Sequence, residues 1–174
     1  MYSPKYEFPQ FAYKNKLLRK LTLWHCVLIP TSTVNWSSLV SLSIGYVDFA
    51  QGVLEKVLSG CPNLECLALE HVSGIHPLEI NSTKLRKLSI ENYYDDNHDR
   101  CLEIIAPYIQ DLHISGLCNE IRVRQRNVAL LVTAMIHVEF DFGGQESNLE
   151  KESRCLKELL HGVAHVKDLK LGNW

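Results

Sequence analysis

The stretch Leu64-Glu-Cys-Leu-Ala-Leu69 places aliphatic residues at its first, fourth and sixth positions. The same spacing recurs at Leu18-Leu21-Leu23, Leu39-Leu42-Ile44, Leu85-Leu88-Ile90 and Ile109-Leu112-Ile114, and more loosely at Leu131-Ala134-Ile136 and Val166-Leu169-Leu171. The central residues of successive copies are 21, 25, 21, 24, 22 and 35 residues apart. Because residues two apart on a strand share one face, each copy predicts a strand with an aliphatic side and a variable side.

Recurrence at this period is typical of a leucine-rich repeat solenoid, in which each coil of chain stacks on its neighbours. We therefore predict an α/β fold: a curved parallel sheet of about seven strands, with short helices and irregular returns on its other face. Residues 17–174 form the repeat domain, and residues 1–16 form an N-terminal segment that acts as a partial cap. The seventh copy ends three residues before Trp174, so we expect the domain to be truncated at its C-terminus.

Three of the returning segments carry helical patterns. Residues 49–58 have an apolar stripe, with Asp48 as the expected N-cap and Gly60 as a left-handed end. Residues 99–106 predict a shorter helix, and residues 147–162 predict the longest one.

Composition indicates an ordinary globular protein that stays inside the cell. The 174 residues are 46% hydrophobic and carry a net charge of -2, which favours neither nucleic acid nor an anionic membrane as partner. The sequence holds no apolar run long enough to span a bilayer and no secretory signal at its start. We interpret the six cysteines as reduced thiols and expect a cytoplasmic or nuclear location.

The variable side of the strands is the expected binding surface for a protein partner. Our candidate partner-binding residues are Trp24, His25, Tyr46, Glu70, His71, Glu91, His113 and His137. Exposed aromatic residues dominate binding hot spots, and histidines respond to pH near neutrality. Two alternatives stay open. Trp24 packs against the N-terminal segment as part of the cap, and His113 and His137 are solvated surface residues.

No group of residues in the sequence forms a convincing catalytic or metal-binding motif. His161 and His165 have the spacing of a helical zinc pair but lack the intervening glutamate. Cys61 and Cys66 are too far apart for a zinc knuckle. Arg122, Arg124 and Arg126 alternate as if to grip a phosphate, but a solvated edge fits them better. We expect no enzyme activity, cofactor or metal.

Several phrases resemble the repeats of plant F-box proteins that often carry a C-terminal FBD domain. They include Leu54-Glu-Lys-Val-Leu-Ser-Gly-Cys-Pro-Asn-Leu-Glu-Cys-Leu-Ala-Leu69, Leu102-Glu-Ile-Ile-Ala-Pro-Tyr-Ile-Gln-Asp-Leu-His-Ile-Ser-Gly116 and Leu159-Leu-His-Gly-Val-Ala-His-Val-Lys-Asp-Leu-Lys-Leu171. The resemblance implies repeats that hold a protein to be ubiquitinated, while an F-box docks on the Skp adaptor of a cullin ligase. This chain shows no F-box or FBD sequence, so Skp and cullin are expected partners only if an F-box lies upstream. The alternative is an interaction scaffold, or a fragment of an immune-type sensor, unrelated to ubiquitin transfer.

Overall fold

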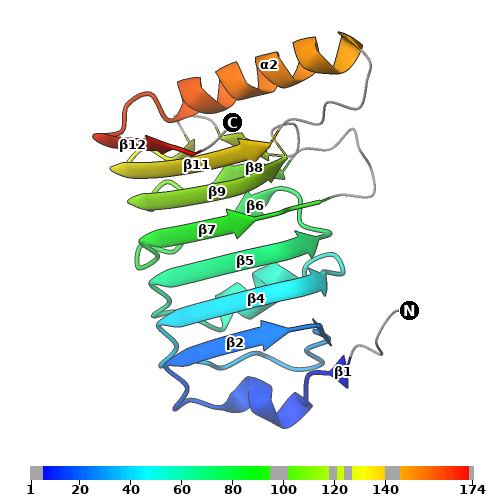
Figure 1. Ribbon diagram of the computed structural model, residues 1–174. Helices are drawn as coiled ribbons and strands as arrows, with labels where there is room; N and C mark the ends of the chain where they lie inside the picture. The colour runs from blue at the N-terminus through cyan, green and yellow to red at the C-terminus, as the bar shows by residue number, and fades with distance from the viewer. Residues whose placement is uncertain (1–5, 95–101, 118–120, 124–126, 140–145, 173–174) are drawn as a thin grey trace.

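The computed structural model describes residues 6–94, 102–117, 121–123, 127–139 and 146–172. Seven parallel strands form one sheet in the order β12-β11-β9-β7-β5-β4-β2, and they lie side by side along the molecule (Figure 1). The strands are β2 (Lys20–Trp24), β4 (Ser41–Asp48), β5 (Cys66–Ser73), β7 (Lys87–Glu91), β9 (Asp111–Leu117), β11 (Thr133–Glu139) and β12 (Asp168–Leu171). The seven-stranded solenoid predicted from the aliphatic repeat is confirmed.

The register of the sheet follows the repeat residue by residue. Leu21, Leu42, Leu67, Leu88, Leu112, Ala134 and Leu169 form one row of Cα partners across all seven strands. From Leu42 to Ala134 this row is buried, and the residues two positions later form a second aliphatic row. A one-residue slip would turn every one of these side chains to the opposite face, so the pattern itself fixes the register.

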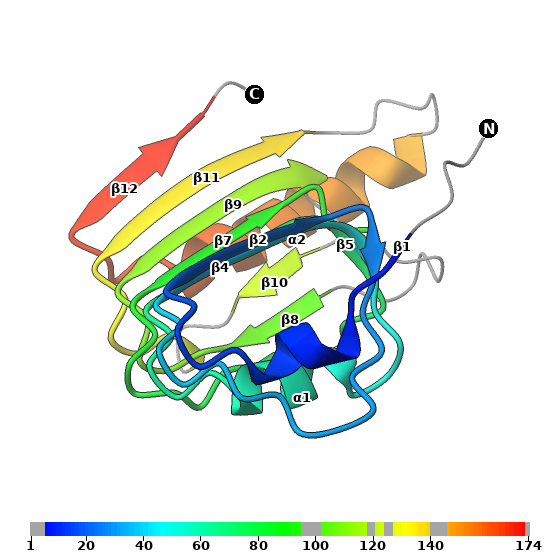
Figure 2. The same ribbon diagram turned by 90° about the horizontal axis from the view of Figure 1, so that it is seen from below.

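A second layer covers the aliphatic side of the sheet (Figure 2). It contains α1 (Val53–Ser59), α2 (Glu146–Gly162) and a three-stranded parallel sheet in the order β10-β8-β6. These strands are β6 (Leu78–Glu79), β8 (Leu102–Ile105) and β10 (Ile121–Val123). The helix predicted over 99–106 is therefore wrong for its described part, because residues 102–105 pair with strands on both sides. The long helix predicted over 147–162 is confirmed within one residue.

The start of α1 differs from the prediction. Gly52, with φ of 76°, occupies the N-cap position, whereas Asp48 is the last residue of β4. The Asp48 carboxylate instead accepts a hydrogen bond of 2.8 Å from the Ser73 hydroxyl, which joins the ends of two neighbouring strands.

The end of α1 also differs. Gly60 has φ of -83°, so it is not the left-handed residue that we predicted. Its lack of a side chain is needed for another reason: a Cβ there would lie 2.5 Å from the Val34 carbonyl oxygen. Glycine is required here by close packing against the preceding coil.

The N-terminal segment packs on the first coils through aromatic rings. It contains η1 (Gln10–Lys14) and β1 (Tyr6–Glu7), which pairs with β3 (Cys26–Val27). Phe8 and Tyr13 are buried, and Tyr13 stacks on Trp36 at 5.7 Å between ring centroids. Trp36 Nε1 donates a 2.8 Å hydrogen bond to the Ala12 carbonyl. That this segment acts as a partial cap stays a prediction.

The described cysteines, Cys26, Cys61, Cys66 and Cys155, are not joined in disulfide bonds. Cys61 is buried between α1 and the first coils, where its thiol donates to the Val57 carbonyl at 3.2 Å. Burial raises the pKa of Cys61 to about 12. Cys66, by contrast, is half-buried on the variable side of β5.

Cys66 is expected to react with iodoacetamide at least about tenfold faster than Cys61 at pH 8, because the thiolate is the nucleophile and access sets the rate. Mass spectrometry of each cysteine peptide measures both rates. In urea the two thiols should react at similar rates. Equal rates in the folded protein would contradict the burial of Cys61.

The Cys61 thiol has a higher pKa in the folded chain than in the unfolded chain. The contribution of the protonated Cys61 thiol to the free energy of unfolding is therefore complete below its ordinary pKa of 9.0, and it is lost as the pH rises toward 12.

Candidate functional site

The variable side of the seven-stranded sheet, which we call the open face, looks toward the viewer in Figure 1, and the second layer lies behind it. Side chains alternate along each strand between the buried aliphatic rows and this face. Three rows of register partners therefore cross the open face, one of which is Trp24, Gly45, Glu70, Glu91, Ser115 and His137. All eight candidate residues lie in these rows or immediately after them.

A line of left-handed residues follows the third row. His25, Tyr46, His71 and Asn92 occupy equivalent positions after Trp24, Gly45, Glu70 and Glu91, and each has a φ between 47° and 56°. This conformation costs non-glycine residues free energy. Because it recurs at the same position in four successive coils, it is a feature of the repeat.

The side chains at these positions form a continuous stack. The Tyr46 ring lies 4.3 Å from the His25 ring and 4.5 Å from the His71 ring, both nearly parallel to it. The Asn92 amide nitrogen contacts His71 Nε2 at 3.3 Å. The predicted residues His25, Tyr46 and His71 are therefore brought together by the structure.

Trp24 lies beside this stack on the open face. Its side chain is 42% exposed, and its ring centroid lies 5.3 Å from that of Tyr46. The ring lies over Gly45, where a Cβ would be only 3.4 Å from the indole. The ring contact of Trp24 is with Tyr46, whereas Trp36 packs against Phe8 and Tyr13 of the N-terminal segment.

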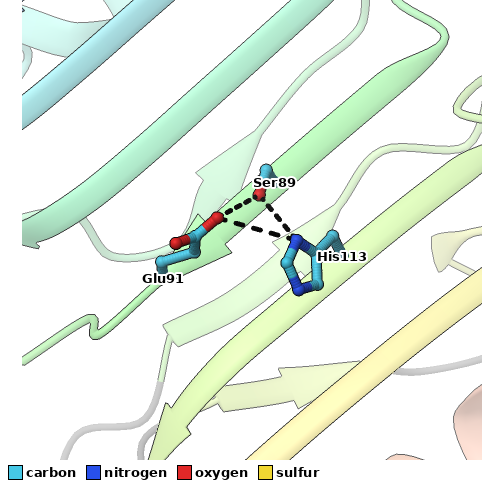
Figure 3. A network of polar contacts seen from close by, with 3 residues as sticks. All are labelled: Ser89, Glu91 and His113. Atoms are coloured by element: carbon cyan, nitrogen blue, oxygen red, sulfur yellow. Dashed lines mark hydrogen bonds and ion pairs between the residues drawn. The ribbon is translucent and has the colours of Figure 1, made fainter. Parts of the chain in front are cut away.

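A polar network joins β7 and β9 further along the sheet (Figure 3). The Ser89 hydroxyl donates to Glu91 Oε1 at 3.1 Å and contacts His113 Nδ1 at 3.2 Å, and Glu91 Oε1 lies 3.6 Å from the same nitrogen. Since a carboxylate only accepts, the Ser89 oxygen is left to accept from Nδ1–H. A catalytic triad places its serine and carboxylate on opposite imidazole nitrogens, so this arrangement is not one.

His137 stands next to this network. Its ring meets the His113 ring edge-on with 5.7 Å between the ring centroids, and it extends over Gly172, the residue after β12. His113 Nε2 is buried without a hydrogen-bond partner among the described residues. The two predicted histidines are therefore in contact with each other, His113 half-buried and His137 exposed to solvent.

The open face is hollowed beside this network. A depression of about 350 Å³ lies over β4, β5, β7, β9 and β11, and Ser89 and His113 of the network are part of its lining. Side chains that line it from the open face are Ser41, Ser43, Cys66, Ala68, Lys87, Ser89, Asp111, His113, Thr133 and Met135. Four of the open-face residues on β4 and β5 are small, and their short side chains leave the depression open. Lys87 Nζ and Asp111 Oδ2 form an ion pair of 3.7 Å at one side. The volume of the depression falls in the range of ligand-binding pockets.

The other candidate motifs do not come together as sites. His165 lies beyond the end of α2, and its Nε2 contacts the Val128 carbonyl at 3.2 Å rather than His161. Arg122 Nε lies 3.9 Å from Glu158 Oε2, whereas Arg124 and Arg126 fall outside the described residues. Within the described ranges, no three His, Cys, Asp or Glu side chains gather as metal ligands. No helix there is long and apolar enough to cross a membrane.

Two features of the site were not predicted. Nothing in the sequence shows that Ser89 bridges Glu91 and His113. Asn92 was not among the candidate residues, although an asparagine is a sequence signal for the left-handed conformation that it adopts.

Comparison with known proteins places the chain among plant repeat proteins. Residues 1–158 match the family described as "At1g61320/AtMIF1, LRR domain". F-box/LRR-repeat protein 25 of Arabidopsis thaliana is 31% identical over 115 residues, which are 65% of this chain and 45% of the relative. F-box protein At5g03100 of the same plant is 32% identical over 182 residues, which are 98% of this chain and 56% of the relative.

The chain thus spans about half the length, or less, of the curated relatives that it matches. No solved structure matches it. The match to the family covers most of the chain and includes six of the seven repeats in register. The chain therefore belongs to the leucine-rich repeat domain family of the At1g61320/AtMIF1 type.

Proposed function

We propose that this chain is a non-catalytic recognition module that holds a protein partner on its open face. In the proposed setting it serves as the substrate-binding part of an F-box subunit, with Skp and cullin bound through a separate F-box. The cytosol or nucleus is the proposed compartment. The observation that carries the proposal is the depression of about 350 Å³ on a face that no described element covers.

Two further observations support this assignment. Eight curated relatives from Arabidopsis thaliana that we compared are named as F-box or F-box/LRR-repeat proteins. Trp24 and the stacked rings of Tyr46 and His71 offer aromatic area beside the depression, and aromatic residues are enriched at binding hot spots. Repeat solenoids bind partners along just such an extended face.

Ala68→Tyr is expected to reduce the amount of captured partner by at least about tenfold. Ala68 lies on the floor of the depression, and a phenol there occupies the space that a partner side chain would fill. The loss corresponds to about 1.4 kcal/mol or more of binding free energy. The measurement is quantitative mass spectrometry of proteins that co-purify with the tagged full-length gene product from plant cells.

Gln51→Tyr is the matched control, because Gln51 is exposed just before α1 on the opposite layer. Skp and cullin should co-purify equally with the wild type and both variants. Capture that survives Ala68→Tyr would exclude the depression as the binding surface. Capture of a partner with neither Skp nor cullin would assign the module to a scaffold outside ubiquitin transfer.

A further inference from the structure

We infer that the partner presents a basic side chain, an arginine or lysine, whose stem lies in the depression and whose charge reaches Glu70 and Glu91 beside Trp24. This inference rests on the proposed function and names the chemistry of the partner.

The floor of the depression suits the stem of such a side chain. Ser43, Cys66 and Ala68 line it, and they stand over the buried aliphatic row of the sheet. Lysine and arginine carry long apolar stems that cover surfaces of this kind while their charged ends reach polar groups. The small floor residues leave the depth that a stem needs.

Carboxylates stand at the end of the depression where the strands run out. Glu70 follows Ala68 by two residues and Glu91 follows Ser89 by two, so both lie one row further on the open face, roughly 7 Å along the strands. Glu70 and Glu91 are direct register partners on neighbouring strands. Their row contains no lysine or arginine.

The two carboxylates are unequally compensated within the chain. Glu91 Oε1 accepts from Ser89 and faces His113. The Glu70 carboxylate has no hydrogen bond or ion pair with any described residue. Glu70 and Glu91 carry like charges on adjacent strands, which repel, and a cation from a partner would offset that repulsion.

Trp24 supplies a second contact for a cation at the same place. Its ring lies over Gly45, the register partner of Glu70, and remains 42% exposed. The face of an indole attracts ammonium and guanidinium groups within about 6 Å. Lys87 cannot take this position because it lies two rows away, paired with Asp111. The chain therefore offers an apolar floor, an aromatic face and two carboxylates without providing the cation itself.

The test is binding of a fluorescein-labelled hexa-arginine peptide to the purified chain, measured by fluorescence anisotropy at physiological salt. We expect saturable binding, weakened at least tenfold by Glu70→Gln with Glu91→Gln. The matched control is Glu55→Gln with Glu79→Gln, which removes the same charge from exposed glutamates outside the sheet's open face and should leave binding unchanged. Trp24→Leu should weaken binding at least threefold, and Trp24→Phe should restore most of it.

Two results would overturn the inference: no saturable binding, or equal losses from both glutamate pairs, which would reveal only net charge. In either case, loss of partner capture on Ala68→Tyr would still uphold the proposed function. If instead the peptide binds as expected but Ala68→Tyr leaves partner capture intact, the proposed function fails by itself.

Discussion

Leu67→Asp is expected to unfold the chain. Leu67 is only 1% exposed and lies in the centre of the aliphatic row, between its register partners Leu42 and Leu88. The change removes a buried aliphatic side chain and puts a carboxylate in an apolar layer where no cation lies beside it, and burying an unpaired charge is very unfavourable. The expected loss is about 4 kcal/mol or more, which approaches the whole stability of many domains.

Ala68→Asp is the control for this experiment, because it introduces the same group at the next residue of the same strand. Ala68 lies on the open face, so its carboxylate is hydrated and the expected loss is about 1 kcal/mol or less. Urea denaturation followed by circular dichroism measures both values. Similar losses for the two variants would show that the strand does not divide its residues between a core and an open face.

The strands were predictable because their signal is local and repeated. Each copy places two aliphatic residues two positions apart, as in Leu67 and Leu69, and both point inward only in an extended segment. Stacking of neighbouring copies then determines the register without further information. Even the loosest copy, around Leu169, pairs in register with the strand before it.

The second layer was harder to predict because its structure depends on distant neighbours. The segment Leu102-Glu-Ile-Ile105 is short and apolar, and periodicity alone cannot separate a buried strand from a helix in such a run. The deciding contacts come from β6 and β10, which pair with it on either side. A single sequence does not show that three returns of different length bring these segments together.

The binding face was predictable in position but not in detail. Alternation along the strands placed Trp24 and Glu70 on one surface, where the structure has them in one row of register partners. The stack of His25, Tyr46 and His71 depends on left-handed backbone at three residues. Histidine is enriched in that conformation, but tyrosine gives no sign of it. The contact between His113 and His137 follows from the register of β9 and β11.

Gly74→Ala is expected to destabilise the chain by about 3 kcal/mol or more, by two effects that add. Gly74 has φ of 74°, which costs an alanine about 1 kcal/mol or more. Its added Cβ would also lie 2.1 Å from the Phe49 carbonyl oxygen, and that oxygen belongs to backbone that cannot rotate away. Phe49 is held by a 3.0 Å hydrogen bond from its N–H to the Ser73 carbonyl, so relieving the clash means separating the ends of β4 and β5.

Gly52→Ala separates these two effects. Gly52 has nearly the same backbone angle, φ of 76°, but nothing lies within 4 Å of its added Cβ. Only the conformational cost then remains, about 1 kcal/mol. Thermal and urea denaturation of the two variants gives the difference, which we expect to be about 2 kcal/mol, the share that comes from close packing. If both alanines cost the same, the approach of Phe49 to Gly74 would carry no energetic weight, and the junction between these two coils would be looser than the structure shows.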